Sequence, residues 1–358
     1  MNVGQVIETM REWVELRGRG TPGFVGAHLA GGILALPPSA PFPPYRDVDV
    51  MLVVDGAPHA DGEDLVYKGL IIGCGMSSVE GYRTPEGILA APGLAGNLGP
   101  DAVILADPQG VLAPLHAAVA REYGKRRWVV ARCEAERRMI QENIDGVARA
   151  AATGSPIAVA QSDDEGLYAQ PLWALSSVVL FLSGLIAVAS LRRPTYRRSY
   201  VLLGELLRGQ GCGDLHEGAL RLPGYERIPR DLAKAYLAAC AAAFDKAVAV
   251  IDRPVPFGYS LRPHVRPYII EGAREMIDEG YHREAMFWIA SYLMIASHAI
   301  GRCAPYPDLS PYQEAVDRLH RDSGLADHGA VSARLAMARE LVADISAVTD
   351  RIIAGVPE

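Results

Sequence analysis

The sequence contains few cysteines and aromatic residues, and it has no excess of positive charge. Five of its 358 residues are cysteine, an odd number with no C-x-x-C pair, so neither a disulfide scaffold nor a zinc framework is expected, and the thiols fit a reducing compartment. Lys and Arg number 35 against 42 Asp and Glu, which gives a formal net charge of −7. Because nucleic-acid backbone is held by clustered cations, this balance argues against a nucleic-acid partner.

The start of the chain lacks the apolar stretch of an export signal. Charged side chains at Glu8, Arg11, Glu12 and Glu15 interrupt the apolar residues of positions 1–18, and a secretory signal needs an uninterrupted apolar segment there. A cytoplasmic location is therefore expected.

One long segment lacks charge altogether. Residues 171–191 are uncharged, are long enough to cross a bilayer, and are followed by Arg192 and Arg193. Several serines dilute this run, however, and a helix buried on all sides of a bundle has the same composition. We expect a central bundle helix and no membrane partner, and a membrane anchor is the alternative.

The pattern of the chain changes near residue 133. Before that point, short β-rich runs predict strands at residues 48–54, 65–72, 102–105 and 128–131, and a proline-rich loop at residues 37–44 precedes them. After it the sequence is rich in alanine and has helical periodicity. The predicted helices are 134–152, 171–191, 199–208, 230–252, 267–279, 282–300, 310–321 and 329–353. The expected fold class is α+β: a small mixed-sheet domain at residues 1–133, followed by an all-α helical bundle at residues 134–358.

The most informative motif is a pair of glycines followed by a strand with two aspartates. Gly31 and Gly32 are separated by fourteen residues from Asp47, and Asp49 follows with one residue between. Alternate residues of a strand share a face, so the two carboxylates lie together and favour a divalent cation such as Mg²⁺. Glycines let backbone N–H groups approach a phosphate closely. The alternative is a solvated acidic strand end beside an ordinary turn.

These residues resemble a motif of the nucleotidyltransferase superfamily, which includes DNA polymerase beta and the kanamycin-type aminoglycoside nucleotidyltransferases. Its pattern is a small residue, Gly, then Gly or Ser, a spacer, and an acid-x-acid strand; Ala30, Gly31, Gly32, Asp47 and Asp49 match it. The order of later segments, a hairpin leading to residues 66–72 and then residues 104–110, is similar to bacterial small-molecule members. The resemblance covers about residues 20–130 at the level of motifs.

The resemblance implies Mg²⁺-dependent transfer of a nucleoside monophosphate from a nucleoside triphosphate to a hydroxyl of a small molecule, such as an aminoglycoside. Asp47 and Asp49 would be catalytic and would bind the metal, with two ions expected. The predicted nucleotide-binding residues are Gly31, Gly32, Arg46, Arg193 and Arg197. The two later arginines come from a stretch that also fits a solvated junction between helices. A homodimer is expected by analogy.

One departure affects the predicted activity. The family usually carries a third carboxylate on the second strand, where this chain has Gly73 and Cys74. Kanamycin-type relatives take a base from the helical domain, and Glu284 is the predicted base here. The other candidates are Glu80, Glu205 and Glu271. The alternatives to transfer are a nucleotide-binding pseudoenzyme or regulatory module, and a nucleotide-dependent biosynthetic enzyme of altered chemistry.

Overall fold

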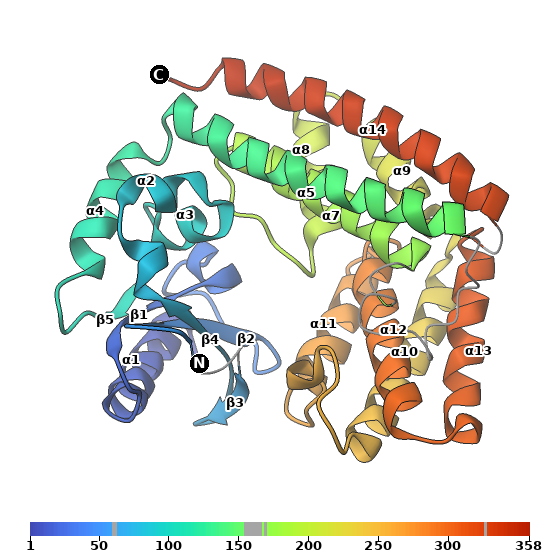
Figure 1. Ribbon diagram of the computed structural model, residues 1–358, viewed down its shortest axis with the longest axis horizontal. Helices are drawn as coiled ribbons and strands as arrows, with labels where there is room; N and C mark the ends of the chain where they lie inside the picture. The colour runs from blue at the N-terminus through green and yellow to red at the C-terminus, as the bar shows by residue number, and fades with distance from the viewer. Residues whose placement is uncertain (59–62, 154–166, 168–169, 326–327) are drawn as a thin grey trace. The chain divides into compact units, whose positions relative to one another are not determined.

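The computed structural model describes residues 1–58, 63–153, 167, 170–325 and 328–358. The chain divides into two compact units (Figure 1). Unit 1 comprises Met1–Ala135, Leu191–Thr195 and Ile353–Glu358, and unit 2 comprises Glu136–Ser190 and Tyr196–Ile352. The first division therefore falls two residues after the predicted boundary, and two later segments return to unit 1.

The described strands of unit 1 form one mixed sheet. They are β1 (Phe24–Leu29), β2 (Asp47–Val54), β3 (Glu63–Tyr67), β4 (Leu70–Ser78) and β5 (Ile104–Ala106), in the spatial order β3-β4-β2-β1-β5. β2 runs parallel to β4, and the other neighbours are antiparallel. The α+β fold class is confirmed at this level.

The two faces of this sheet carry different side chains. α1 (Val3–Arg19) packs with Val48, Val50 and Leu52 on one face. The short helices α2 (Pro85–Ala90), α3 (Pro92–Leu98) and α4 (Leu112–Glu122) pack on the other, where Val53 is buried (Figure 1). Asp47 and Asp49 alternate with the α1-facing residues, so both belong to the face that carries α2–α4.

Two of the predicted strands are corrected. The run at residues 65–72 is a hairpin, because Lys68 and Gly69 both have positive φ angles (48° and 80°) and turn the chain between β3 and β4. Residues 128–131 are not a strand but part of α5 (Arg126–Thr153). A run of four residues fits either structure, and the apolar positions Val129, Cys133 and Ile140 recur at helical spacing. β1, α4 and the short helices α2, α3 and α9 were not predicted from the sequence.

In its described residues unit 2 contains helices and connecting loops but no strand, and it includes most of α5 (Figure 1). The remaining α-helices are α7 (Pro171–Ala189), α8 (Ser199–Gly209), α9 (Asp214–Arg221), α10 (Arg230–Val250), α11 (Arg266–Asp278), α12 (Met286–Cys303), α13 (Tyr306–Asp322) and α14 (His328–Ala354). In the described part of the chain, α7 is the one helix long and apolar enough to cross a membrane, and 89% of its most apolar window is buried. Such burial is what the core-helix interpretation expects.

A buried arginine, Arg132, connects the start of α5 to the C-terminal ends of α2 and α4. Arg132 is 1% exposed, and its Nη1 donates to the Leu89 carbonyl (3.1 Å) while its Nη2 donates to the Tyr123 carbonyl (2.7 Å). The guanidinium also lies 4.4 Å from the Tyr123 ring centroid. These carbonyls end α2 and α4, where helix dipoles place partial negative charge, so they stabilise a buried cation.

We predict that Arg132→Met destabilises the protein by about 2–3 kcal/mol, because a buried carbonyl and a part-buried carbonyl lose a charged hydrogen-bond donor. Urea unfolding measures the effect. Arg121→Met is the matched control, since Arg121 lies on α4 with 74% of its side chain exposed, and it should shift the midpoint little. Equal midpoints for the two variants would contradict the role given to Arg132.

Candidate functional site

The glycine turn packs directly on one of the two predicted carboxylates. Gly31 has a φ angle of 68°, and a Cβ atom there would lie 1.8 Å from Oδ2 of Asp49. The Ala30 N–H donates to the Asp49 backbone carbonyl at 2.9 Å. A Cβ on Gly32, in contrast, would meet no atom within 4 Å. The structure therefore brings Gly31 and Asp49 together as predicted, and it places a steric constraint on only the first of the two glycines.

Asp49 carries its carboxylate in an environment that disfavours charge. Burial raises the pKa of Asp49 to about 6, because desolvation penalises the ionised form. Asp47 lies two residues earlier on the same face and is half-buried. A cation between these side chains would relieve the desolvated charge, which fits a divalent ion with oxygen ligands.

The neighbouring strand provides no third carboxylate in the row of Asp49. In the parallel register of β2 and β4, Asp49 pairs with Gly73, Asp47 with Ile71, and Met51 with Gly75. The residues that the structure describes contain no group of three His, Cys, Asp or Glu side chains arranged to hold a metal. An ion bound by Asp47 and Asp49 would therefore receive no carboxylate ligand from β4 in this row, and water or substrate oxygens could complete its coordination. Beyond β4, the backbone of Asp64 on β3 pairs with Gly73 in the same row of the sheet.

The predicted phosphate-binding arginines have different environments. Arg46 directly precedes Asp47 and is half-buried. Arg193 belongs to the segment of unit 1 at residues 191–195, where desolvation lowers its pKa against the opposing effects of Tyr123 and Asp101. For both residues, phosphate binding stays a prediction.

Arg197 belongs to unit 2 and is buried against α11. Its Nη1 donates to the Tyr268 carbonyl at 3.0 Å, and its guanidinium lies 4.8 Å from the Tyr268 ring centroid. The backbone of Gly272 packs so closely that a Cβ there would lie 2.2 Å from Arg197 Nη1. Binding a phosphate through Arg197 would require breaking these contacts.

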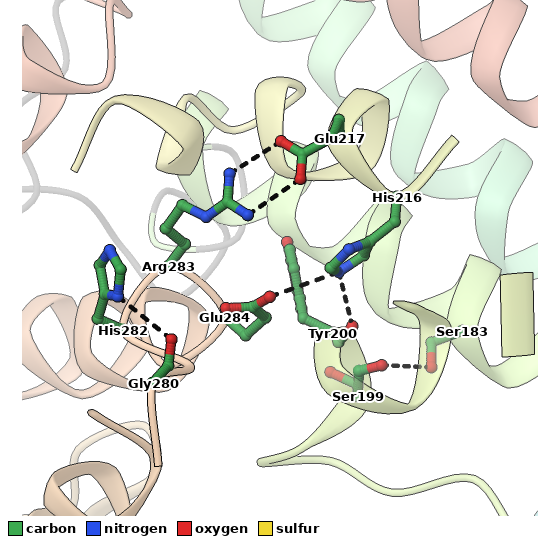
Figure 2. A network of polar contacts seen from close by, with 9 residues as sticks. All are labelled: Ser183, Ser199, Tyr200, His216, Glu217, Gly280, His282, Arg283 and Glu284. Atoms are coloured by element: carbon green, nitrogen blue, oxygen red, sulfur yellow. Dashed lines mark hydrogen bonds and ion pairs between the residues drawn. The ribbon is translucent and has the colours of Figure 1, made fainter. Parts of the chain in front are cut away.

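The predicted base Glu284 lies in the turn before α12, inside a polar network of unit 2 (Figure 2). It is 6% exposed, and its Oε1 is 3.8 Å from Nε2 of His216. That nitrogen donates to the Tyr200 carbonyl at 3.1 Å. Desolvation lowers the pKa of His216 despite the opposing effect of Glu284, so the carboxyl group faces a neutral imidazole at neutral pH.

Glu284 is flanked by an ion pair that ties its turn to α9. Arg283 donates two hydrogen bonds to Glu217, at 2.8 and 3.0 Å (Figure 2). This geometry gives the turn a structural role, and the use of Glu284 as a base stays a prediction. Of the other candidates, Glu80 and Glu271 form ion pairs with Arg83 and Arg274, and Glu205 is exposed.

The sequence analysis missed a carboxyl group that titrates near neutral pH. Burial raises the pKa of Glu136, on α5, to about 7. Its carboxylate lies against α7, where a Cβ on Gly184 would be 2.7 Å from Glu136 Oε2. The one available signal was a glycine among the bulky residues of α7, which marks a close approach but does not identify its partner. A carboxyl with this pKa can exchange protons at neutral pH.

A groove of about 860 Å³ lies between α1 and the edge strand β5 in unit 1. Its lining does not include Asp47 or Asp49. Its charged side chains form ion pairs along α1, between Glu8 and Arg11 and between Glu15 and Arg19, as expected for a solvated helix face.

Comparison with known proteins adds no relative: neither a protein-family model nor a curated protein sequence matches the chain. Functional inference therefore depends on the residues and geometry of the site itself.

We predict that Asp49→Asn stabilises the protein at neutral pH. The folded pKa of about 6 lies above the ordinary value of 3.8, so the carboxyl is neutral in both states only well below pH 3.8. Between 3.8 and 6 the unfolded state ionises while the folded state keeps its proton, and the folded state loses up to about 2–3 kcal/mol of stability across this range. The Tm difference between variant and wild type should thus be absent near pH 3, grow between pH 4 and 6, and reach its maximum above pH 7.

The control for this experiment is Asp55→Asn, which changes an exposed aspartate just after β2. It removes one exposed carboxylate, and it should change Tm much less than Asp49→Asn does. A wild-type profile retained by Asp49→Asn would contradict the desolvation of Asp49.

We predict that Gly31→Ala disrupts the turn, whereas Gly32→Ala is tolerated. The first variant combines a left-handed backbone, unfavourable by about 1–2 kcal/mol for a residue with Cβ, with a collision against Asp49. Thermal unfolding of the pair measures the difference. Equal stability of the two variants would show that the turn does not pack on Asp49.

Proposed function

We propose that unit 1 binds a Mg²⁺–nucleoside triphosphate complex at Asp47, Asp49 and the Gly31 turn, and that the protein transfers the nucleoside monophosphate to a small-molecule hydroxyl. The contact between the Gly31 backbone and the Asp49 carboxylate carries this proposal. This contact places a glycine turn, which has no side chain, beside a desolvated carboxyl group on one face of the sheet. The resemblance of the same residues to the nucleotidyltransferase motif supports it.

In this reaction the acceptor oxygen bonds to the α-phosphorus while the bond from that phosphorus to the β-phosphate oxygen breaks. Pyrophosphate leaves, and the hydroxyl proton passes to a general base. Bound Mg²⁺ would neutralise charge on the phosphates. Asp47 and Asp49 would hold and orient the charged complex, and the backbone of Gly31 packs against the Asp49 carboxylate and fixes its position, so the contribution of unit 1 is positioning and electrostatics.

Two carboxylates make metal binding depend on the nucleotide. Mg²⁺ takes about six oxygen ligands and is commonly held by one or two carboxylates together with substrate phosphates. With Gly73 in the row of Asp49, the phosphates supply ligands that a third acid would otherwise provide. We therefore expect weak binding of Mg²⁺ alone and mutual strengthening of metal and nucleotide binding.

Gly73, which replaces the expected third acid, favours a second candidate function: a regulatory or binding module that holds nucleotide without transferring it. Loss of an acid at Gly73 removes a group that completes a metal site or assists proton removal, and such assistance contributes about 10²- to 10⁴-fold in rate. The two functions differ in turnover and share the nucleotide site.

We predict Mg²⁺-dependent pyrophosphate release from one of ATP, GTP, CTP or UTP in the presence of aminoglycosides or other polyols. Asp47→Asn and Asp49→Asn should each abolish it, because each removes one of two metal-binding carboxylates. Calorimetry with the same nucleotides, with and without Mg²⁺, measures binding separately. Binding without product would favour the binding module, and full turnover by both variants would refute the proposed site.

A further inference from the structure

A histidine side chain holds the last peptide of β1, immediately before the glycine turn. His28 is fully buried, and its Nδ1 lies 2.8 Å from the carbonyl oxygen of Leu29. Its Nε2 lies 2.9 Å from the hydroxyl of Tyr82. Tyr82 in turn forms a hydrogen bond with Ser77 of β4. A chain of polar contacts thus links β4 to the point where β1 ends.

The direction of every hydrogen bond in this chain is determined. A carbonyl only accepts, so Nδ1 of His28 carries the proton and donates to Leu29. Desolvation lowers the pKa of His28, which keeps the ring neutral at neutral pH, and Nε2 is then an acceptor. The Tyr82 hydroxyl therefore donates to Nε2 and accepts from Ser77. Burial raises the pKa of Tyr82 to about 12, so this donor keeps its proton.

We propose that His28 is a positioning residue for the glycine turn, with Tyr82 selecting the tautomer that donates to Leu29. This inference rests on the proposed nucleotide site. The Leu29 carbonyl held by His28 and the Ala30 N–H held by the Asp49 carbonyl belong to the same peptide group. Both ends of that peptide group are therefore held by hydrogen bonds. The next residue, Gly31, has a left-handed backbone and packs against the Asp49 carboxylate.

The alternative is that His28 only fills space in the core of unit 1. Two substitutions of the same residue separate these roles. Asn can place an amide N–H near the position of Nδ1, and Gln can place a carbonyl oxygen near Nε2. His28→Asn therefore retains the donor to Leu29, whereas His28→Gln retains the acceptor for Tyr82 and loses that donor. Both remove an imidazole ring from the same core position.

The first measurement is amide hydrogen exchange in the protein without nucleotide, at residues 29–32. We expect near wild-type protection in His28→Asn and faster exchange in His28→Gln. The second is calorimetric affinity for Mg²⁺–nucleotide, expected to fall about two- to tenfold more in His28→Gln than in His28→Asn, the range for one hydrogen bond. Global stability, measured by urea unfolding, should fall similarly in the two variants.

Equal exchange at residues 29–32 in the two variants would overturn the proposal. If the wild type binds no nucleotide, the proposed function fails, and the exchange comparison still decides the role of His28. Should both variants fail to fold, Tyr82→Phe provides the test, because it removes one oxygen and retains the ring. It should speed exchange at residues 29–32, because without the Tyr82 hydroxyl the His28 ring can carry its proton on Nε2 and lose the hydrogen bond to Leu29. Unchanged exchange in that variant would also overturn the proposal.

Discussion

The contact between the Asp49 carboxylate and the bare backbone of Gly31 is the constraint on which the functional interpretation of unit 1 depends. It requires a glycine with left-handed backbone, a strand that directs alternate side chains to the face opposite α1, and a peptide at the end of β1 held in one orientation. Each requirement comes from a different segment of the chain. Since the carboxylate is desolvated there, the contact also fixes the electrostatics of the site.

The chemistry of this site follows from its neighbours on β4. Gly73 is paired with Asp49, so β4 presents backbone at the position where a third acid would be expected, and the Met51 side chain packs against the neighbouring Gly75. A two-carboxylate site binds a metal together with its phosphate ligands more readily than the metal alone. Under the proposed function, the arrangement would select for a preformed metal–nucleotide complex, and this selection would apply to transfer and to simple binding alike.

The sequence predicted those parts of the fold whose signals are local. Alternation in residues 48–54 predicted β2 and its two faces, and helical periodicity predicted most helices of unit 2 within a few residues. β1 was missed because Gly26 and Ala27 weaken a strand pattern in a fully buried strand. Residues 128–131 were too few to reveal their period. The environments of Glu136, His28 and Arg197 arise from segments far apart in the sequence, and no local pattern encodes them.

Asp49 also shows why site and stability oppose each other in this fold. A neutral side chain at that position would suit the buried environment better at physiological pH, since desolvation penalises the ionised form. Without a bound cation, ionisation of Asp49 lowers the free energy of unfolding. A cation bound to the carboxylate would restore part of that stability. Ligand affinity and folding stability are therefore linked through one carboxyl group. Such linkage is characteristic of acids arranged for binding or catalysis, where pKa shifts concentrate.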